Sequence, residues 1–167
     1  MIKKIFITIL LSVTLISNSY SAGSSSSGGE GDGPKTKTNY EKAVKFIKSA
    51  KKFEKKGKKD KAQSNYEKAL KLLLKSNNKK PNKPDTLNYL GFTSRKLGDF
   101  ENGEKYYLQG LAINPYHIGI NEYLGELYVA TNRHNLAVER LEVLKGCDCK
   151  EYDDLKAIIA GEKVSKY

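Results

Sequence analysis

The chain has 167 residues and a formal net charge of +11. That length allows one ordinary domain. The positive charge is not accompanied by a basic and aromatic motif of the kind that binds nucleic acid, which argues against a nucleic-acid partner.

The first 22 residues have the pattern of a secretory signal peptide. Lys3 and Lys4 precede an apolar core at residues 5–16, and residues 17–22 are mostly small and polar. The core is shorter than the ~20 apolar residues that cross a bilayer, although a retained anchor or a buried helix is the alternative. No cysteine lies at the junction, so this is not a lipoprotein signal. We therefore expect a periplasmic or secreted protein.

Residues 23–37 are rich in glycine and serine, and we expect a disordered tether there. Residues 38–83 follow with a degenerate helix pair and an insertion at residues 77–83, where Pro81 interrupts the helical pattern. The positions that carry the spacing of this first pair are Phe46, Ala50, Phe53, Gly57, Ala62, Tyr66 and Ala69.

The charge is distributed unevenly along the chain. Residues 35–83 hold 18 lysines against four acidic residues, a net of +14, whereas residues 84–167 sum to −3. Residues 42–83 could therefore face an anionic membrane surface, an acidic partner or the acidic end of another copy. The alternative is a solvated helix face with no partner.

Residues 84–117 contain the clearest helix pair. A first helix is expected at residues 86–97 because Leu87 and Leu90 recur on one face. Gly98 can supply the left-handed residue that stops it, and Asp99 can cap the return helix at residues 100–113. The residues expected to face inward on the return helix are Gly103, Tyr107, Gly110 and Leu111, and Pro115 ends the pair.

Residues 118–150 contain the next pair, and residues 151–167 a capping helix and tail. Leu124 and Gly125 recur 34 residues after Leu90 and Gly91. Asn132 replaces the turn glycine, since asparagine accepts left-handed geometry more readily than most residues. A helix at residues 153–163 would cover the open end of the stack.

This 34-residue period resembles the tetratricopeptide repeat (TPR) family over about residues 40–150. Leu90, Gly91, Tyr107 and Pro115 are spaced as in the family pattern. The tail from Cys147 onward is also similar to the ending of small exported proteobacterial TPR proteins. The resemblance implies an all-α, right-handed TPR solenoid of about three helix-turn-helix pairs plus a C-terminal capping helix.

The resemblance also implies that the first helix of each pair lines a concave groove, in which a partner peptide or helix binds. The groove positions carried over from the two clear pairs include Asp85, Asn88, Phe92, Arg95, Lys96, Glu122 and Glu126. Those of the degenerate pair include Val44, Ile47, Lys51, Glu54 and Lys55. Phe92 could instead pack against a neighbouring helix. Because the two groove glutamates would repel a C-terminal carboxylate, we expect a partner with mixed or basic charge.

Cys147 and Cys149 are the only cysteines, and export favours a disulfide between them. Intermolecular pairing, free thiols or a redox-active pair are the alternatives. Metal binding is not expected, because His117 and His134 lack ligand spacing and are better explained as exposed or capping residues. No catalytic constellation or phosphate-binding glycine motif is found, so no cofactor and no enzymatic activity are predicted.

We therefore predict a protein-interaction scaffold or adaptor of the cell envelope. Two other hypotheses remain from different classes of protein. One is a thiol–disulfide redox or assembly factor that uses Cys147 and Cys149. The other is a membrane-surface or self-assembling structural protein that uses its lysine-rich end.

Overall fold

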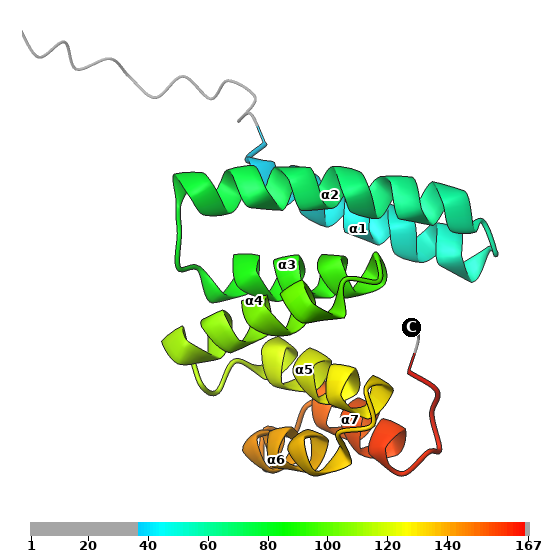
Figure 1. Cartoon of the computed structure of the whole chain (residues 1–167), viewed down its shortest axis with the longest axis vertical. Helices are drawn as coiled ribbons and strands as arrows, with labels where there is room; N and C mark the ends of the chain where they lie inside the picture. Colours follow the sequence, from blue (N-terminus) through cyan, green and yellow to red (C-terminus); the bar gives the residue numbers. More distant parts are fainter. Residues whose placement is uncertain (1–36, 166–167) are drawn as a thin grey trace, which may run out of the picture. The chain divides into compact units, whose positions relative to one another are not determined.

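The computed structural model describes residues 37–165, so the predicted signal segment and nearly all of the predicted tether lie outside the described residues. The described residues belong to one compact unit, Thr36–Tyr167. Within residues 37–165 there are seven helices and no strands (Figure 1). The helices are α1 (Asn39–Lys55), α2 (Lys59–Lys79), α3 (Pro84–Lys96), α4 (Phe100–Ile113), α5 (Ile118–Ala130), α6 (His134–Leu144) and α7 (Lys150–Ile159).

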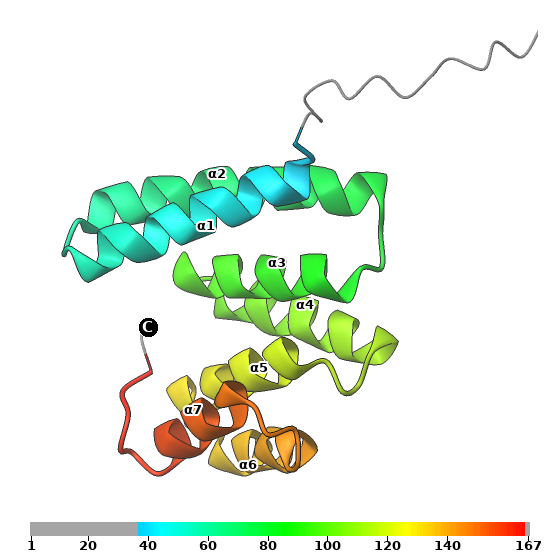
Figure 2. The same ribbon diagram turned by 180° about the vertical axis from the view of Figure 1, so that it is seen from behind.

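The helices form three antiparallel pairs followed by a single helix. Helix α1 packs on α2, α3 on α4, and α5 on α6, whereas α2–α3 and α4–α5 contacts join successive pairs (Figures 1 and 2). Helix α7 packs on both α5 and α6. The predicted all-α solenoid of three helix pairs plus a C-terminal helix is confirmed.

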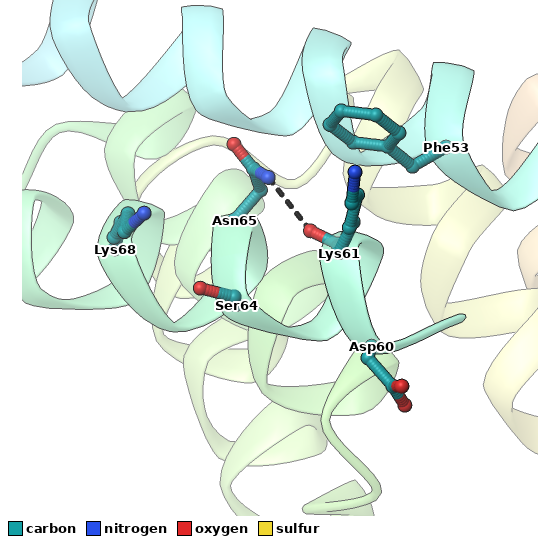
Figure 3. A pocket seen from close by; sticks show the side chains of 6 residues that line it. All are labelled: Phe53, Asp60, Lys61, Ser64, Asn65 and Lys68. Carbon is teal, nitrogen blue, oxygen red and sulfur yellow. Dashed lines mark hydrogen bonds between the residues drawn. The ribbon is translucent and has the colours of Figure 1, made fainter. Parts of the chain in front are cut away.

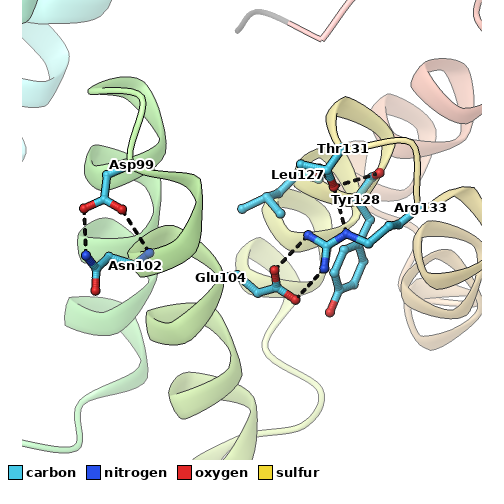
Figure 4. Close-up of polar contacts among 7 residues, drawn as sticks. All are labelled: Asp99, Asn102, Glu104, Leu127, Tyr128, Thr131 and Arg133. Carbon is cyan, nitrogen blue, oxygen red and sulfur yellow. Dashed lines mark hydrogen bonds and ion pairs between the residues drawn. The ribbon is translucent and has the colours of Figure 1, made fainter.

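Local signals set the turn inside the second pair. Pro84 begins α3, two residues before the predicted start, because proline suits the first turn of a helix. Gly98 follows α3 with a φ of 86°, which a residue with a side chain rarely adopts. Asp99 then caps α4 by accepting a hydrogen bond from the backbone N–H of Asn102 at 3.1 Å (Figure 4).

Helix α2 is longer than its counterpart α4, with 21 residues against 14. The predicted insertion at residues 77–83 is helical as far as Lys79, and only the remainder forms the connection to α3. Most of the residues in its last two turns are leucine and lysine, which are good helix formers, so the chain extends the helix until Pro81 stops it. Helix α7 is also displaced, since it begins at Lys150 and ends at Ile159 rather than covering residues 153–163.

Glycine permits close packing at two points of the stack. An ideal Cβ on Gly91 would lie 2.5 Å from Cε1 of Tyr107, whose side chain is fully buried. An ideal Cβ on Gly125 would lie 2.6 Å from Cδ2 of Leu155 on α7. The first glycine allows α3 and α4 to approach, and the second allows α7 to cover α5.

A two-pronged ion pair joins the second pair to the third. Arg133, in the turn between α5 and α6, donates to both carboxylate oxygens of Glu104 on α4, at 2.9 and 2.7 Å (Figure 4). The same guanidinium lies 4.6 Å from the ring centroid of Tyr128. Two parallel hydrogen bonds fix orientation as well as distance, so this contact sets how α4 meets the α5–α6 turn.

Candidate interaction surface on the inner face

The first helices of the three pairs, α1, α3 and α5, contact one another in order along the stack. Side chains from all three meet near the C-terminal halves of α1 and α3 and along α5. We call this region the inner face and define it as Lys51, Glu54, Phe92, Arg95, Lys96, Glu122, Tyr123 and Glu126.

Phe92 lies at the centre of the inner face and is only 3% exposed. Its ring centroid is 5.2 Å from that of Tyr123 on α5 and 6.0 Å from that of Tyr66 on α2. The Lys51 ammonium lies 4.4 Å from the Phe92 ring centroid, in a cation–π contact. Phe92 therefore packs between neighbouring helices in the structure and presents little surface to a partner.

Arg95 ties α3 to α5. Its side chain is buried, and its guanidinium donates to the Tyr123 backbone carbonyl at 2.6 Å and to the Glu126 carboxylate at 3.2 Å. Burial raises the pKa of the Glu126 carboxyl, although the Arg95 charge opposes that rise. Removing either partner would leave a buried charge without compensation, so this pair holds the repeats together.

Lys96 makes the corresponding connection from α3 to α1. Its ammonium lies 2.6 Å from the Glu54 carboxylate, which also accepts a hydrogen bond from the Tyr66 hydroxyl at 3.0 Å. Burial, followed by the Glu54 charge, raises the pKa of the Tyr66 hydroxyl, so it stays a neutral donor. The lysine predicted for the groove is therefore engaged within the protein.

Asp85 and Asn88 lie away from the inner face, at the opposite end of α3. Asp85 is exposed, and its carboxylate lies 3.1 Å from Nε2 of His117. His117 is the N-cap of α5, and its Nδ1 accepts from the Ile120 backbone N–H. Asn88 is 9% exposed and packs toward Gly119. The five residues of α3 that were predicted for the groove thus divide between its two ends, whereas the other two, Glu122 and Glu126, lie on α5.

Glu122 differs from the other acidic residues of the inner face. It is only 8% exposed, yet its carboxylate makes no hydrogen bond or ion pair with any residue in the range 37–165. Burial, followed by the charges of Glu126, Glu151 and Asp154, raises the pKa of this carboxyl to about 8. Lys51 attracts Glu122 electrostatically from α1 but does not come within ion-pair distance.

The segment after α7 turns back and passes the C-terminal end of α5 (Figures 1 and 2). Lys163 pairs with Asp154 at 2.5 Å, and the Ser165 hydroxyl lies 3.5 Å from the Glu126 carboxylate. Neither this segment nor Tyr123 was predicted from the sequence to lie on the interaction surface. Their place on the surface follows only from the packing of segments distant in the sequence, because neither lies at a position of the repeat pattern that predicts the groove.

Two hollows of the described surface lie outside the inner face. Figure 3 shows a pocket between α1 and α2, where the Asn65 side-chain amide donates to the Lys61 carbonyl at 2.6 Å. A second hollow lies at residues 132–136. Within residues 37–165 no three His, Cys, Asp or Glu side chains are grouped so as to hold a metal ion. The same range contains no helix with the length and apolar character needed to span a membrane.

Cys147 and Cys149 are joined by a disulfide in the turn between α6 and α7. Asp148 between them has a φ of 43°, and Cys149 is the N-cap residue of α7. Both cysteines are partly exposed.

Comparison with known proteins supports the repeat and the fold. Residues 85–117 match the family model of the tetratricopeptide repeat. A search of the curated proteins found no match. The structure is similar to the first TPR domain of Spaghetti (RPAP3) bound to the HSP90 peptide SRMEEVD, with a TM-score of 0.53 and 19% identity over 77% of this chain and 98% of that one.

A second similar structure is the second TPR domain of human RPAP3 in complex with the HSP70 peptide SGPTIEEVD. It has a TM-score of 0.51 and 17% identity over 73% of this chain and 98% of that one. The fold thus defines an all-α helical-repeat protein. More particularly, the chain carries a tetratricopeptide repeat at residues 85–117, and its fold is that of TPR domains.

Proposed function

We propose that this protein is a non-enzymatic interaction scaffold of the cell envelope, which binds a peptide or helix of a partner protein on its inner face. The TPR fold supports the proposal, because two similar TPR domains are bound to peptides. Helical grooves bind such segments through anchor positions on one face of the ligand. The signal-peptide pattern of residues 1–22 supports the envelope location.

The observation that carries the proposal is the unpaired carboxylate of Glu122. Glu54, Glu126 and Asp154 each pair with a cationic side chain, whereas Glu122 has no such partner among the described residues. Burying a carboxylate without a counter-charge is unfavourable. A lysine or arginine of the partner would supply that charge, and Lys51 would favour an acidic group nearby. The partner segment would therefore carry mixed charge.

Crosslinked capture of envelope proteins by the tagged chain tests the proposal. The variant is Glu122→Gln, which removes the carboxylate without removing bulk. Glu101→Gln is the matched control, because Glu101 is exposed on α4 and makes no ion pair within residues 37–165. Phe92 and Arg95 are unsuitable, since their replacement would disturb the packing between repeats.

A partner recovered by the wild type and the control but lost with Glu122→Gln would support docking on the inner face. Equal recovery of the same partners by all three proteins would show that Glu122 does not contact the partner.

A thiol–disulfide factor is the second candidate function, because the Cys147–Cys149 disulfide is partly exposed at the start of α7. Thiols at helix N-termini have lowered pKa values and react readily. A Cys147→Ser variant, which lacks the thiol that would release the product, would then trap mixed disulfides with envelope proteins through Cys149. The scaffold proposal predicts no mixed disulfide and unchanged capture of the partner by this variant.

A further inference from the structure

The first helix pair presents an unusual concentration of exposed lysines. Residues 37–83 contain 17 lysines, four acidic residues and no arginine. All of these lysines except Lys51 are exposed. None of the exposed ones makes an ion pair with a residue in the range 37–165, so their charge is not neutralised within the described fold.

Helical spacing gathers many of these lysines into two stripes. On each helix the stripe lies opposite the buried side, which consists of Ala43, Ile47 and Ala50 on α1 and of Ala62, Tyr66, Ala69 and Leu73 on α2. We call the two stripes the lysine face and define it as Lys45, Lys48, Lys52 and Lys55 of α1 with Lys61, Lys68, Lys71, Lys75 and Lys79 of α2.

Two lysines of the α2 stripe contact the neighbouring helix α1. The Lys61 ammonium lies 5.9 Å from the ring centroid of Phe53, and Lys68 lies at the same distance from Phe46 (Figure 3 shows the first of these). Both phenylalanines belong to α1, so lysines of α2 reach across the seam between the helices. The pair also lies at the free end of the stack, with α3 on its other side (Figures 1 and 2).

We propose that the lysine face docks the protein on an anionic phospholipid surface. Lysine is a hydrated point charge that suits phosphate groups without fixed geometry, whereas directional recognition of one carboxylate or phosphate favours arginine. From Lys61 to Lys79 the face extends over ~27 Å of α2, which suits a broad charged surface better than a single acidic side chain. Docking at this end leaves the inner face free for a protein partner.

Vesicle co-sedimentation tests the proposal with the chain from Gly23 onward, which keeps the whole compact unit and lacks the apolar segment. The variant is Lys48→Glu, Lys68→Glu and Lys75→Glu together. The control is Lys105→Glu, Lys145→Glu and Lys156→Glu, three exposed lysines outside the first pair. The two triple variants have the same net charge, so only the position of the change differs. Circular dichroism would verify that both retain their helices.

A lysine near an anionic surface contributes roughly a fivefold gain in partitioning, so three reversals should weaken binding by at least ~100-fold. We expect binding to vesicles of phosphatidylcholine with phosphatidylglycerol, none to phosphatidylcholine alone, and loss of binding at 0.5 M salt. The control should bind within about threefold of the unchanged chain, because the attraction falls off within a Debye length of the surface and its three lysines lie outside the lysine face. Equal losses in the two variants would overturn the assignment to this face. Failure of the chain to bind the anionic vesicles would overturn the proposal. The proposal would also be overturned if the chain bound a soluble acidic protein or nucleic acid but not the vesicles.

Discussion

Replacing Glu122 by glutamine should stabilise the folded protein at neutral pH. Burial raises the pKa of this carboxyl from its ordinary value of 4.5 to about 8, so the folded state holds the proton more tightly than the unfolded state. The contribution of Glu122 to the free energy of unfolding should therefore be most favourable below pH 4.5. This contribution is lost as the pH rises from 4.5 to about 8.

The magnitude follows from the linkage between protonation and folding. Each pH unit in that window costs about 1.4 kcal/mol, so the free energy of unfolding is lowered by roughly 3 kcal/mol at pH 7. Glutamine cannot ionise and avoids this cost. The stabilisation by Glu122→Gln should thus be near zero at pH 4.5 and about 3 kcal/mol at pH 7.

Urea unfolding followed by circular dichroism at pH 4.5, 6 and 7 would measure the effect. Glu101→Gln, an exposed replacement, should change the free energy of unfolding by less than about 0.5 kcal/mol at each pH. A destabilising effect of Glu122→Gln at pH 7 would mean that Glu122 is ionised and compensated within the folded protein. A stabilisation of equal size at all three pH values would mean that folding does not raise the pKa of this carboxyl. Either result would contradict the prediction.

Three further changes test the packing described above, each by thermal or urea unfolding. Gly91→Ala should lower the free energy of unfolding by about 1–3 kcal/mol, because the Cβ of the new alanine would collide with Tyr107. An unchanged melting temperature would show that the Tyr107 ring can move aside. Arg95→Ala should cost about 3–5 kcal/mol by leaving Glu126 buried and unpaired, and a cost below about 1 kcal/mol would contradict that pairing. Gly98→Ala should cost about 1 kcal/mol through its positive φ, and no loss would mean that the turn adjusts.

Local signals predicted the order and pairing of the helices well. Gly98 and Asn132 both adopt the positive φ expected at the turns within a pair, and Asp99 caps α4 as its position suggested. Such features depend on a few neighbouring residues, so the sequence carries them directly. The end of α2 was not predicted correctly from the sequence, because the helix-forming residues of its last turns outweigh the insertion pattern.

The candidate surface could be predicted only in part. The spacing of α3 placed Phe92 and Arg95 on one stripe, but it could not show that α1, α2 and α5 cover them. Burial of a helix stripe depends on segments distant in the sequence. For the same reason, the missing counter-charge of Glu122 becomes visible only when its surroundings on α5 and α7 are known. The role of these residues in binding a partner stays a prediction.

Position-specific photo-crosslinking in the cell envelope would show which face of the protein contacts the partner. A photoreactive residue at Lys51 would report contacts on the inner face, and one at Lys105 would report contacts on the exposed side of α4. We expect that one partner is crosslinked from Lys51 and not from Lys105, and that Glu122→Gln abolishes the product. A partner crosslinked from Lys105 alone would contradict the assignment of the inner face as the binding surface.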